Sequence, residues 1–97
     1  MKYTMKVKIT DPKTPAGMMS EIFFNLECEF FCKEGDYGNG YYVAISGEHF
    51  AEQYIDLRYD TSFNKNEKAE WLVSWAKNYW SGENGAWAVK SVEVTSA

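Results

Sequence analysis

The stretch that decides the fold is "EIFFNLECEFFCKE", residues 21–34. Apolar side chains occupy six consecutive alternate positions, at Ile22, Phe24, Leu26, Cys28, Phe30 and Cys32. Successive side chains of a strand point to opposite faces, so this alternation predicts a strand with one apolar row. A helix would leave Phe24 and Phe31 on its polar side and would place Glu29 inside the apolar arc. We therefore expect residues 22–32 to be extended.

The residues that follow predict a hairpin. Three glycines in "GDYGNG", residues 35–40, supply the backbone freedom of a turn, and "YYVAIS", residues 41–46, is expected to be the returning strand. The register has to keep the apolar side chains on one face, since a slip of one residue would turn the whole set over. The pairs that satisfy this condition are Cys32 with Tyr41, Phe30 with Val43, and Cys28 with Ile45.

Three more strands complete the expected sheet. Residues 3–9 alternate apolar and polar side chains, and "DPKTPAG", residues 11–17, follows as a loop. "YIDLRYD", residues 54–60, predicts a fourth strand antiparallel to the third, and the sequence leaves open whether residues 46–53 hold a helical turn. "AWAVKSVEVT", residues 86–95, alternates imperfectly, which indicates a bulge near Lys90–Ser91 or a strand buried on both faces, and we favour the bulge.

An amphipathic helix is predicted by "NKNEKAEWLVSWAKNYWSG", residues 64–82. Asn64 is expected to be its N-cap, Glu67 completes a capping-box pattern, and Gly82 stands where a left-handed C-terminal glycine is expected. At about 100° per residue, five apolar residues fall on one side, namely Trp71, Leu72, Trp75, Ala76 and Tyr79. That side is expected to pack on the apolar face of the sheet.

Together these elements predict an α+β fold. An antiparallel sheet of about five strands, in the order β-β-β-β-α-β, would carry one amphipathic helix on one face. A chain of 97 residues is expected to form a single domain over residues 1–97. Its aromatic content of 18% supplies enough large rings to fill a core of this size.

Composition argues against several kinds of function. The net charge of −4 makes a nucleic-acid binder unfavourable, because such proteins need cations to neutralise phosphates. No segment approaches the roughly 18 apolar residues of a membrane helix, and the N-terminus lacks the apolar stretch of a signal peptide, so we expect a cytoplasmic protein with no membrane partner. Cys28 and Cys32 are expected to be buried free thiols, because their spacing fits no common zinc or redox motif. No cofactor and no metal ion is expected.

The second row of side chains on these strands predicts the candidate binding surface. Lys6 and Lys8 are expected on the face that the helix leaves open, close enough to Glu27 or Glu29 to pair across strands. Four rings are expected to form an aromatic patch there, namely Phe23, Phe31, Tyr42 and Tyr54. Trp80 and Trp87 flank "SGENGA", residues 81–86, where they either seal the end of the core or contact a ligand.

The run "DLRYDTSFNKNEKAEWLVSWAKNYWSGENGAWAVKSV", residues 56–92, resembles small uncharacterised proteins carried by bacterial phages and integrative mobile elements. Its most specific parts are "YDTSF" and "NYWSGENGAW", and "ECEFFCKEGDYGNGYY" gives a fainter likeness upstream. The resemblance implies a bacterial cytosol and an accessory role in the life of the phage or element. It brings no known activity and no site residues.

The sequence therefore predicts a small protein-interaction module that binds a protein partner, or a second copy of itself as a homodimer, through the aromatic open face or a sheet edge. Two alternatives stay open. His49 lies near Glu48 and Glu52 in "SGEHFAEQ", residues 46–53, where an enzyme or metal site would need further ligands. The acidic surface would otherwise imitate nucleic acid and occupy a basic protein.

Overall fold

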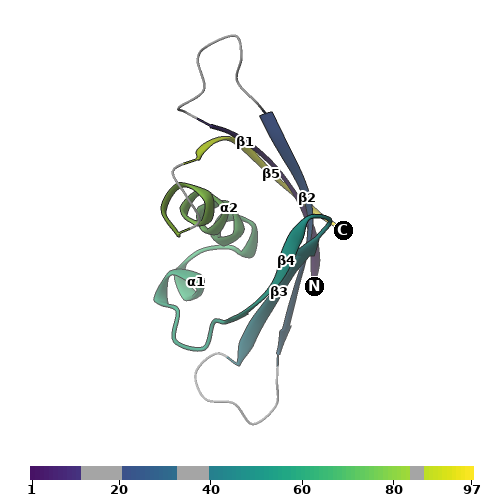
Figure 1. The fold of residues 1–97 in the computed structure, drawn as a ribbon. Coiled ribbons are helices and arrows are strands. Elements are labelled where there is room, and N and C mark those ends of the chain that lie inside the picture. The colour runs from purple at the N-terminus through teal and green to yellow at the C-terminus, as the bar shows by residue number, and fades with distance from the viewer. Residues whose placement is uncertain (12–20, 33–39, 84–86) are drawn as a thin grey trace.

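The computed structural model describes residues 1–11, 21–32, 40–83 and 87–97, and these residues have the predicted α+β architecture (Figure 1). One antiparallel sheet carries a layer of helices on one face. The strands are β1 (Lys2–Thr10), β2 (Glu21–Cys32), β3 (Tyr41–Gly47), β4 (Phe50–Asp56) and β5 (Ala88–Ser96). The helical elements are α1 (Thr61–Lys65), α2 (Lys68–Asn78) and a π-helical turn, η1 (Tyr79–Glu83).

β2 lies at the centre of the sheet, whose strand order is β4-β3-β2-β1-β5. The predicted strand over residues 22–32 is confirmed. Its predicted register with β3 is also confirmed, because Phe30 lies opposite Val43 and Cys28 lies opposite Ile45. The sheet curves around the helices with its concave side toward them (Figure 1). The apolar row of β2 therefore faces the helical layer.

β5 carries the bulge that its imperfect alternation predicted. β1 places Lys8 opposite Ser91 and Ile9 opposite Val89, so Lys90 is the extra residue. A bulge shifts the alternation of a strand by one residue. Valines on both sides of Lys90 consequently pack against the core.

The core fills the space between the sheet and α2. Its fully buried side chains come from β1, β2, β3, the residue after β4 and the helix, and they include Met5, Leu26, Ile45, Leu57 and Leu72. The predicted inner side of α2 is confirmed, since Trp71 and Ala76 are buried while Trp75 and Tyr79 pack against the core. The opposite side of the helix is exposed, as expected for an amphipathic element.

Asp60 joins α1 to α2 through both of its carboxylate oxygens. Oδ1 accepts a hydrogen bond from the backbone N–H of Phe63 at 2.9 Å, which caps α1. Oδ2 accepts one from Nε1 of Trp71 at 3.2 Å. The Phe63 ring stacks on Phe30 of β2 with a centroid separation of 5.6 Å. One side chain thus fixes the position of two rings that close the core at this end.

The prediction for the fourth strand is wrong in its bounds. β4 begins at Phe50, four residues before the predicted Tyr54, and ends at Asp56. The connection from β3 is a two-residue turn in which His49 adopts a positive φ of 57°, so the described structure contains no helical turn between residues 46 and 53. Tyr59 therefore lies beyond the end of this strand and is 74% exposed.

The predicted ends of the helix are also wrong. Asn64 lies inside α1 and not at an N-cap, because Asp60 caps that short helix and Asn66 ends it. The Nδ2 of Asn66 donates to the carbonyl of Ser62 at 2.9 Å, and its own backbone is extended. α2 then starts after Glu67, whose side chain makes no capping bond. At the other end Gly82 belongs to η1, and its φ is not positive.

The two cysteines have different surroundings, so the prediction of two buried thiols holds for one of them. Cys28 is a buried free thiol, and burial raises its pKa to about 12. Cys32 is a free thiol that is exposed, because it ends β2 beyond the cover of the helices. The predicted loop after β1 and the predicted glycine turn after β2 lie mostly outside the described residues.

We predict that Gly47→Ala destabilises the fold. A Cβ at this position would lie 2.7 Å from the backbone oxygen of Asn25 and 2.7 Å from Cδ2 of Leu26. Relieving such a clash within a sheet costs about 1–3 kcal/mol. Urea unfolding should show a free energy of unfolding that is lower by this amount. Gly82→Ala is the matched control, since its Cβ would meet no atom within 4 Å, and an equal loss in both variants would contradict the argument.

Candidate interaction surface

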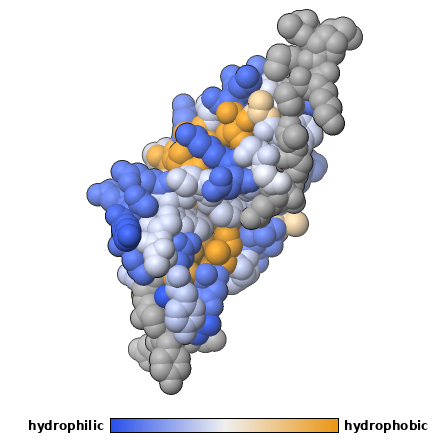
Figure 2. All heavy atoms as spheres, turned by 90° about the vertical axis from the view of Figure 1, so that its left-hand side faces the viewer, coloured by the Kyte–Doolittle hydropathy of each residue, from blue (hydrophilic) through white to orange (hydrophobic). Residues whose placement is uncertain are grey.

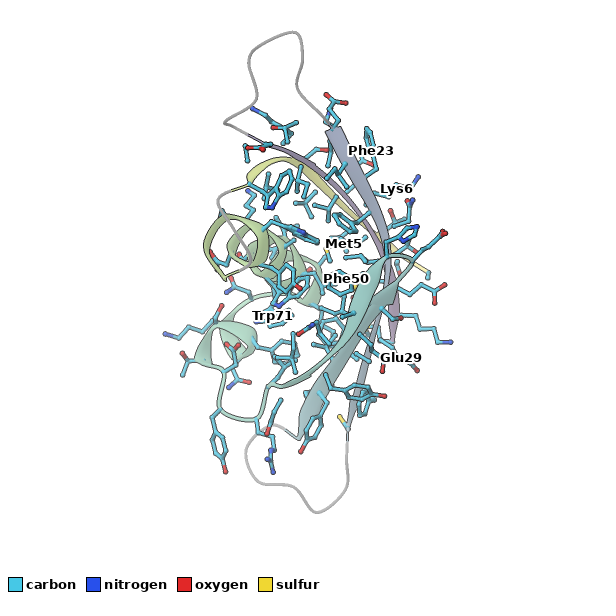
Figure 3. The ribbon with its side chains drawn as sticks, viewed as in Figure 1. Met5, Lys6, Phe23, Glu29, Phe50 and Trp71 are labelled. Atoms are coloured by element: carbon cyan, nitrogen blue, oxygen red, sulfur yellow. The ribbon has the colours of Figure 1, made fainter. Side chains whose placement is uncertain are left out.

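The face of the sheet opposite the helices is covered by no described element, and we call it the outer face. Figure 3 shows Phe23, Lys6 and Glu29 projecting from this face, while Met5 and Trp71 lie between the sheet and the helices. Phe23 is 65% exposed and Tyr54 is 69% exposed, although both are large apolar rings. The predicted open face is therefore present in the monomer.

Three of the four predicted rings come together on the outer face, and we call Phe31, Tyr42 and Tyr54 the ring cluster. Phe31 and Tyr42 lie directly opposite each other on β2 and β3, and their rings stack at 5.7 Å with an interplanar angle of 15°. Tyr54 meets Phe31 edge-on at 6.1 Å. Aromatic pairs of this geometry are favourable beyond the area that they bury.

Phe23 lies apart from the ring cluster. It stands eight residues from Phe31 along the same strand, which corresponds to about 26 Å at the rise of an extended chain. Its neighbour across the strands is Lys8, whose Nζ lies 6.0 Å from the ring centroid. The predicted four-ring patch is thus a three-ring cluster at one end of β2 and a single exposed ring at the other.

Arg58 holds a fixed position beside the ring cluster. Its guanidinium carbon lies 5.5 Å from the centroid of the Tyr42 ring, within the range of a cation–π contact. Both carboxylate oxygens of Asp56 accept hydrogen bonds from the guanidinium, the shortest from Nη2 at 2.6 Å. These bonds to Arg58 hold the pKa of the Asp56 carboxyl below its ordinary value. The edge of the cluster is consequently preorganised.

The lysines of β1 do not pair as predicted. β1 places Lys8 opposite Phe23 and Lys6 opposite Asn25. The ion pair of Lys8 is with Glu21, at 3.9 Å, and not with Glu27 or Glu29. The prediction used only the alternation of each strand, which fixes the face of a side chain but not its neighbour on the next strand.

Carboxylates lie next to the ring cluster. Glu27, Glu29 and Glu52 line a depression of about 260 Å³, and Tyr54 and Lys2 are among the other residues of its border. Three acids around one lysine make this part of the outer face negative. A basic side chain of a bound protein would be attracted here, and the adjacent rings would supply apolar contact.

The two predicted tryptophans have different positions. Trp80 is 4% exposed and packs on Phe24 with a centroid separation of 5.1 Å, so it belongs to the core and not to a binding surface. The backbone N–H of Trp87 donates to the carbonyl of Trp80 at 3.1 Å, and the Trp87 side chain is half-buried. Trp87 therefore closes the end of the core while its ring still reaches the surface.

His49 does not form the site that its neighbours in sequence suggested. Its Nε2 lies 3.6 Å from Oε1 of Glu48, and the side chains of both residues are about 90% exposed (88% and 90%). Residues 50–56 form a strand, so Glu52 is not on a helix with His49. Among the residues that the structure describes, no three His, Cys, Asp or Glu side chains are grouped to hold a metal ion.

The helix side of the molecule and the comparisons with known proteins add no described residue to the outer face. The helix side of the molecule is largely hydrophilic, with separate hydrophobic areas (Figure 2). None of the described helices is long and apolar enough to cross a membrane. No protein-family model matches the chain, and neither a curated protein nor a solved structure matches it.

We predict that the ion pair of Asp56 and Arg58 makes stability depend on pH. A carboxyl whose pKa is lowered by folding stabilises the fold above its ordinary value of 3.8, and this contribution is lost as the pH falls through the lower pKa of the folded state. Arg58→Gln should therefore reduce the free energy of unfolding at pH 7, and the difference from the wild type should shrink in acid. Urea unfolding of both proteins at pH 7 and in acid measures this difference in the free energy of unfolding. A difference that does not vary with pH would contradict the prediction.

Proposed function

We propose that this chain is a protein-interaction module whose outer face binds a partner protein that presents basic and apolar side chains. The observation that carries the proposal is the ring cluster beside the carboxylates of Glu27, Glu29 and Glu52. The proposed anchor residues are Phe31, Tyr42 and Tyr54.

The exposed rings support an apolar contact. Tyr54 leaves 69% of its surface in water, and it meets the ring of Phe31, which itself stacks on Tyr42. Aromatic residues dominate the energetic centre of protein interfaces, because they bury a large area at a small cost in side-chain entropy. The stacking between Phe31 and Tyr42 reduces that cost further.

The charges of the outer face support a basic partner. Two of its acids are neutralised within the monomer, since Glu21 pairs with Lys8 and Asp56 with Arg58. Glu27, Glu29 and Glu52 remain around the depression with Lys2 as their nearest cation there. A second copy of the chain would bring the same negative region to the contact, so a different protein with lysine or arginine fits this face better.

The place of action is part of the proposal. The resemblance of residues 56–92 to proteins of bacterial phages and integrative elements supports a partner in the bacterial cytoplasm, encoded by the host or by the element. The acidic-mimic alternative is a special case of this function in which the partner is a nucleic-acid-binding protein.

We predict that Phe31→Ser combined with Tyr54→Ser weakens partner binding by about tenfold or more, which is the loss expected for central interface rings. A photoreactive amino acid at position 42 would first capture the partner in cells, and mass spectrometry would identify it. The purified partner would then be titrated against the wild type and the double variant by calorimetry. Binding to the wild type should also weaken at high salt.

Tyr59→Ser is the matched control, because Tyr59 is 74% exposed but lies beyond the end of β4. An unchanged affinity of the double variant would overturn the proposal. Sedimentation velocity of the wild type and of the double variant, each without a partner, tests whether a second copy of the chain occupies this face. A dimer of the wild type that the double variant abolishes would show that it does.

A further inference from the structure

One edge of β2 has no neighbouring strand among the described residues over Glu21–Asn25. The pairing of β2 with β3 runs from Cys32 opposite Tyr41 to Leu26 opposite Gly47, and there the chain turns into β4. On its other edge β2 stays paired with β1 up to Glu21. Figure 1 shows β2 continuing past the turn between β3 and β4. Five residues of the central strand therefore form an edge.

The backbone groups of Glu21 and Phe23 point to this edge, whereas the carbonyl of Asn25 already lies against Gly47 at the end of β3. In an antiparallel sheet, alternate residues of a strand direct their N–H and C=O groups to opposite neighbours. Phe30 exchanges both bonds with Met1, which continues β1, with Phe30 N to Met1 O at 2.9 Å and Met1 N to Phe30 O at 3.2 Å. Phe24 and Ile22 therefore face β1, and Phe23 and Glu21 face away from it. An added strand would find these donors and acceptors in place.

A cavity lies beside the same edge on the helix side of the sheet. Its volume is about 210 Å³, and aromatic and aliphatic side chains make up most of its wall. Ile22 and Phe24 contribute from β2, and η1 contributes Tyr79 and Trp80. The other lining residues are Ile9, His49, Phe50, Ala51 and Trp87. An apolar side chain is the group that such a cavity accepts.

We propose that this edge and cavity capture an extended segment of a partner protein, which adds to the sheet as a strand beside Glu21–Asn25. The segment would alternate, with apolar side chains over the cavity and polar ones beside Phe23 on the outer face. The turn at Glu48–His49 limits the paired length to about five residues, or about 17 Å. The exposed carboxylate of Glu48, at the end of the edge next to the turn, favours a lysine or arginine in the segment.

The other two edges of the sheet are less suited to strand addition. β5 carries a bulge at Lys90, and both a bulge and an edge lysine hinder pairing. On β4 the side-chain Nε2 of Gln53 donates a hydrogen bond to the backbone carbonyl of Ala51 at 3.1 Å. Glu52 and Asp56 also place negative charges along this strand. The assignment to β2 does not depend on the ring cluster.

The test first selects peptides that bind this protein from a library of random eight-residue peptides displayed on ribosomes. The selected peptides are then titrated against the wild type and two variants at Phe23. Phe23→Ser and Phe23→Pro both remove the ring, but only proline removes the N–H that points to the edge. We expect Phe23→Ser to keep affinity within about threefold and Phe23→Pro to lose at least about tenfold. The selected sequences should carry large apolar residues at alternate positions and a lysine or arginine.

A second measurement uses the wild-type protein, so it stands even where Phe23→Pro fails to fold. N-methylation of the peptide amide that pairs with Phe23 should abolish binding, while N-methylation of the adjacent amide should leave it unchanged. Equal tolerance of both methyl groups would overturn the proposal. Peptides that bind both Phe23 variants equally but lose affinity to Phe31→Ser with Tyr54→Ser would also overturn it, and they would support binding at the outer face instead.

Discussion

The structure depends on the one-sided packing of β2 against the helical layer. Leu26, Cys28 and Phe30 are at most 3% exposed, and α2 and α1 cover them with Trp71, Leu72 and Phe63. Because the alternation of a strand is fixed by its backbone, burying this row forces the intervening side chains outward. The exposure of the outer face is thus a consequence of how the core is built. A change that shifted β2 by one residue would lose both the core and the candidate surface.

A second constraint is the unequal length of the strands around β2. β2 has 12 residues and β3 has 7, so the sheet is complete on the β1 side and incomplete on the other. The chain has to turn after Gly47, which lies tightly against Asn25 and Leu26, and His49 accepts a positive φ to make this turn. The return brings Phe50 inward against Phe24 and Trp80. The same packing that shortens the hairpin leaves the edge of β2 open and builds the wall of the cavity beside it.

How far the sequence predicted these features depends on whether a local pattern determines them. The register of β2 with β3 and the bulge at Lys90 follow from alternation, because each residue of a strand has only two possible faces. The N-cap does not follow from local pattern, since Asn64 and Asp60 are both good capping residues, and the bond from Trp71 Nε1 to Asp60 is a tertiary contact. Trp80 lies just outside the apolar arc of a regular helix, and the wider π-helical turn of η1 changes the direction of its side chain. A sheet edge was predicted as one possible contact, but its location on β2 was not, because single-strand patterns contain no information on where a neighbouring strand ends.

The two candidate surfaces lie at opposite ends of β2, and this arrangement restricts how one partner would use both. The ring cluster is on the outer face near Phe31, whereas the open edge centres on Phe23, about 26 Å away along the strand. A segment paired with the edge would be collinear with β3 and would meet the turn at Glu48–His49. To reach the ring cluster it would have to leave the plane of the sheet there and cross the outer face past Glu27 and Glu52. Basic residues on the connecting stretch would then link the two surfaces, since those carboxylates lie on the outer face between them.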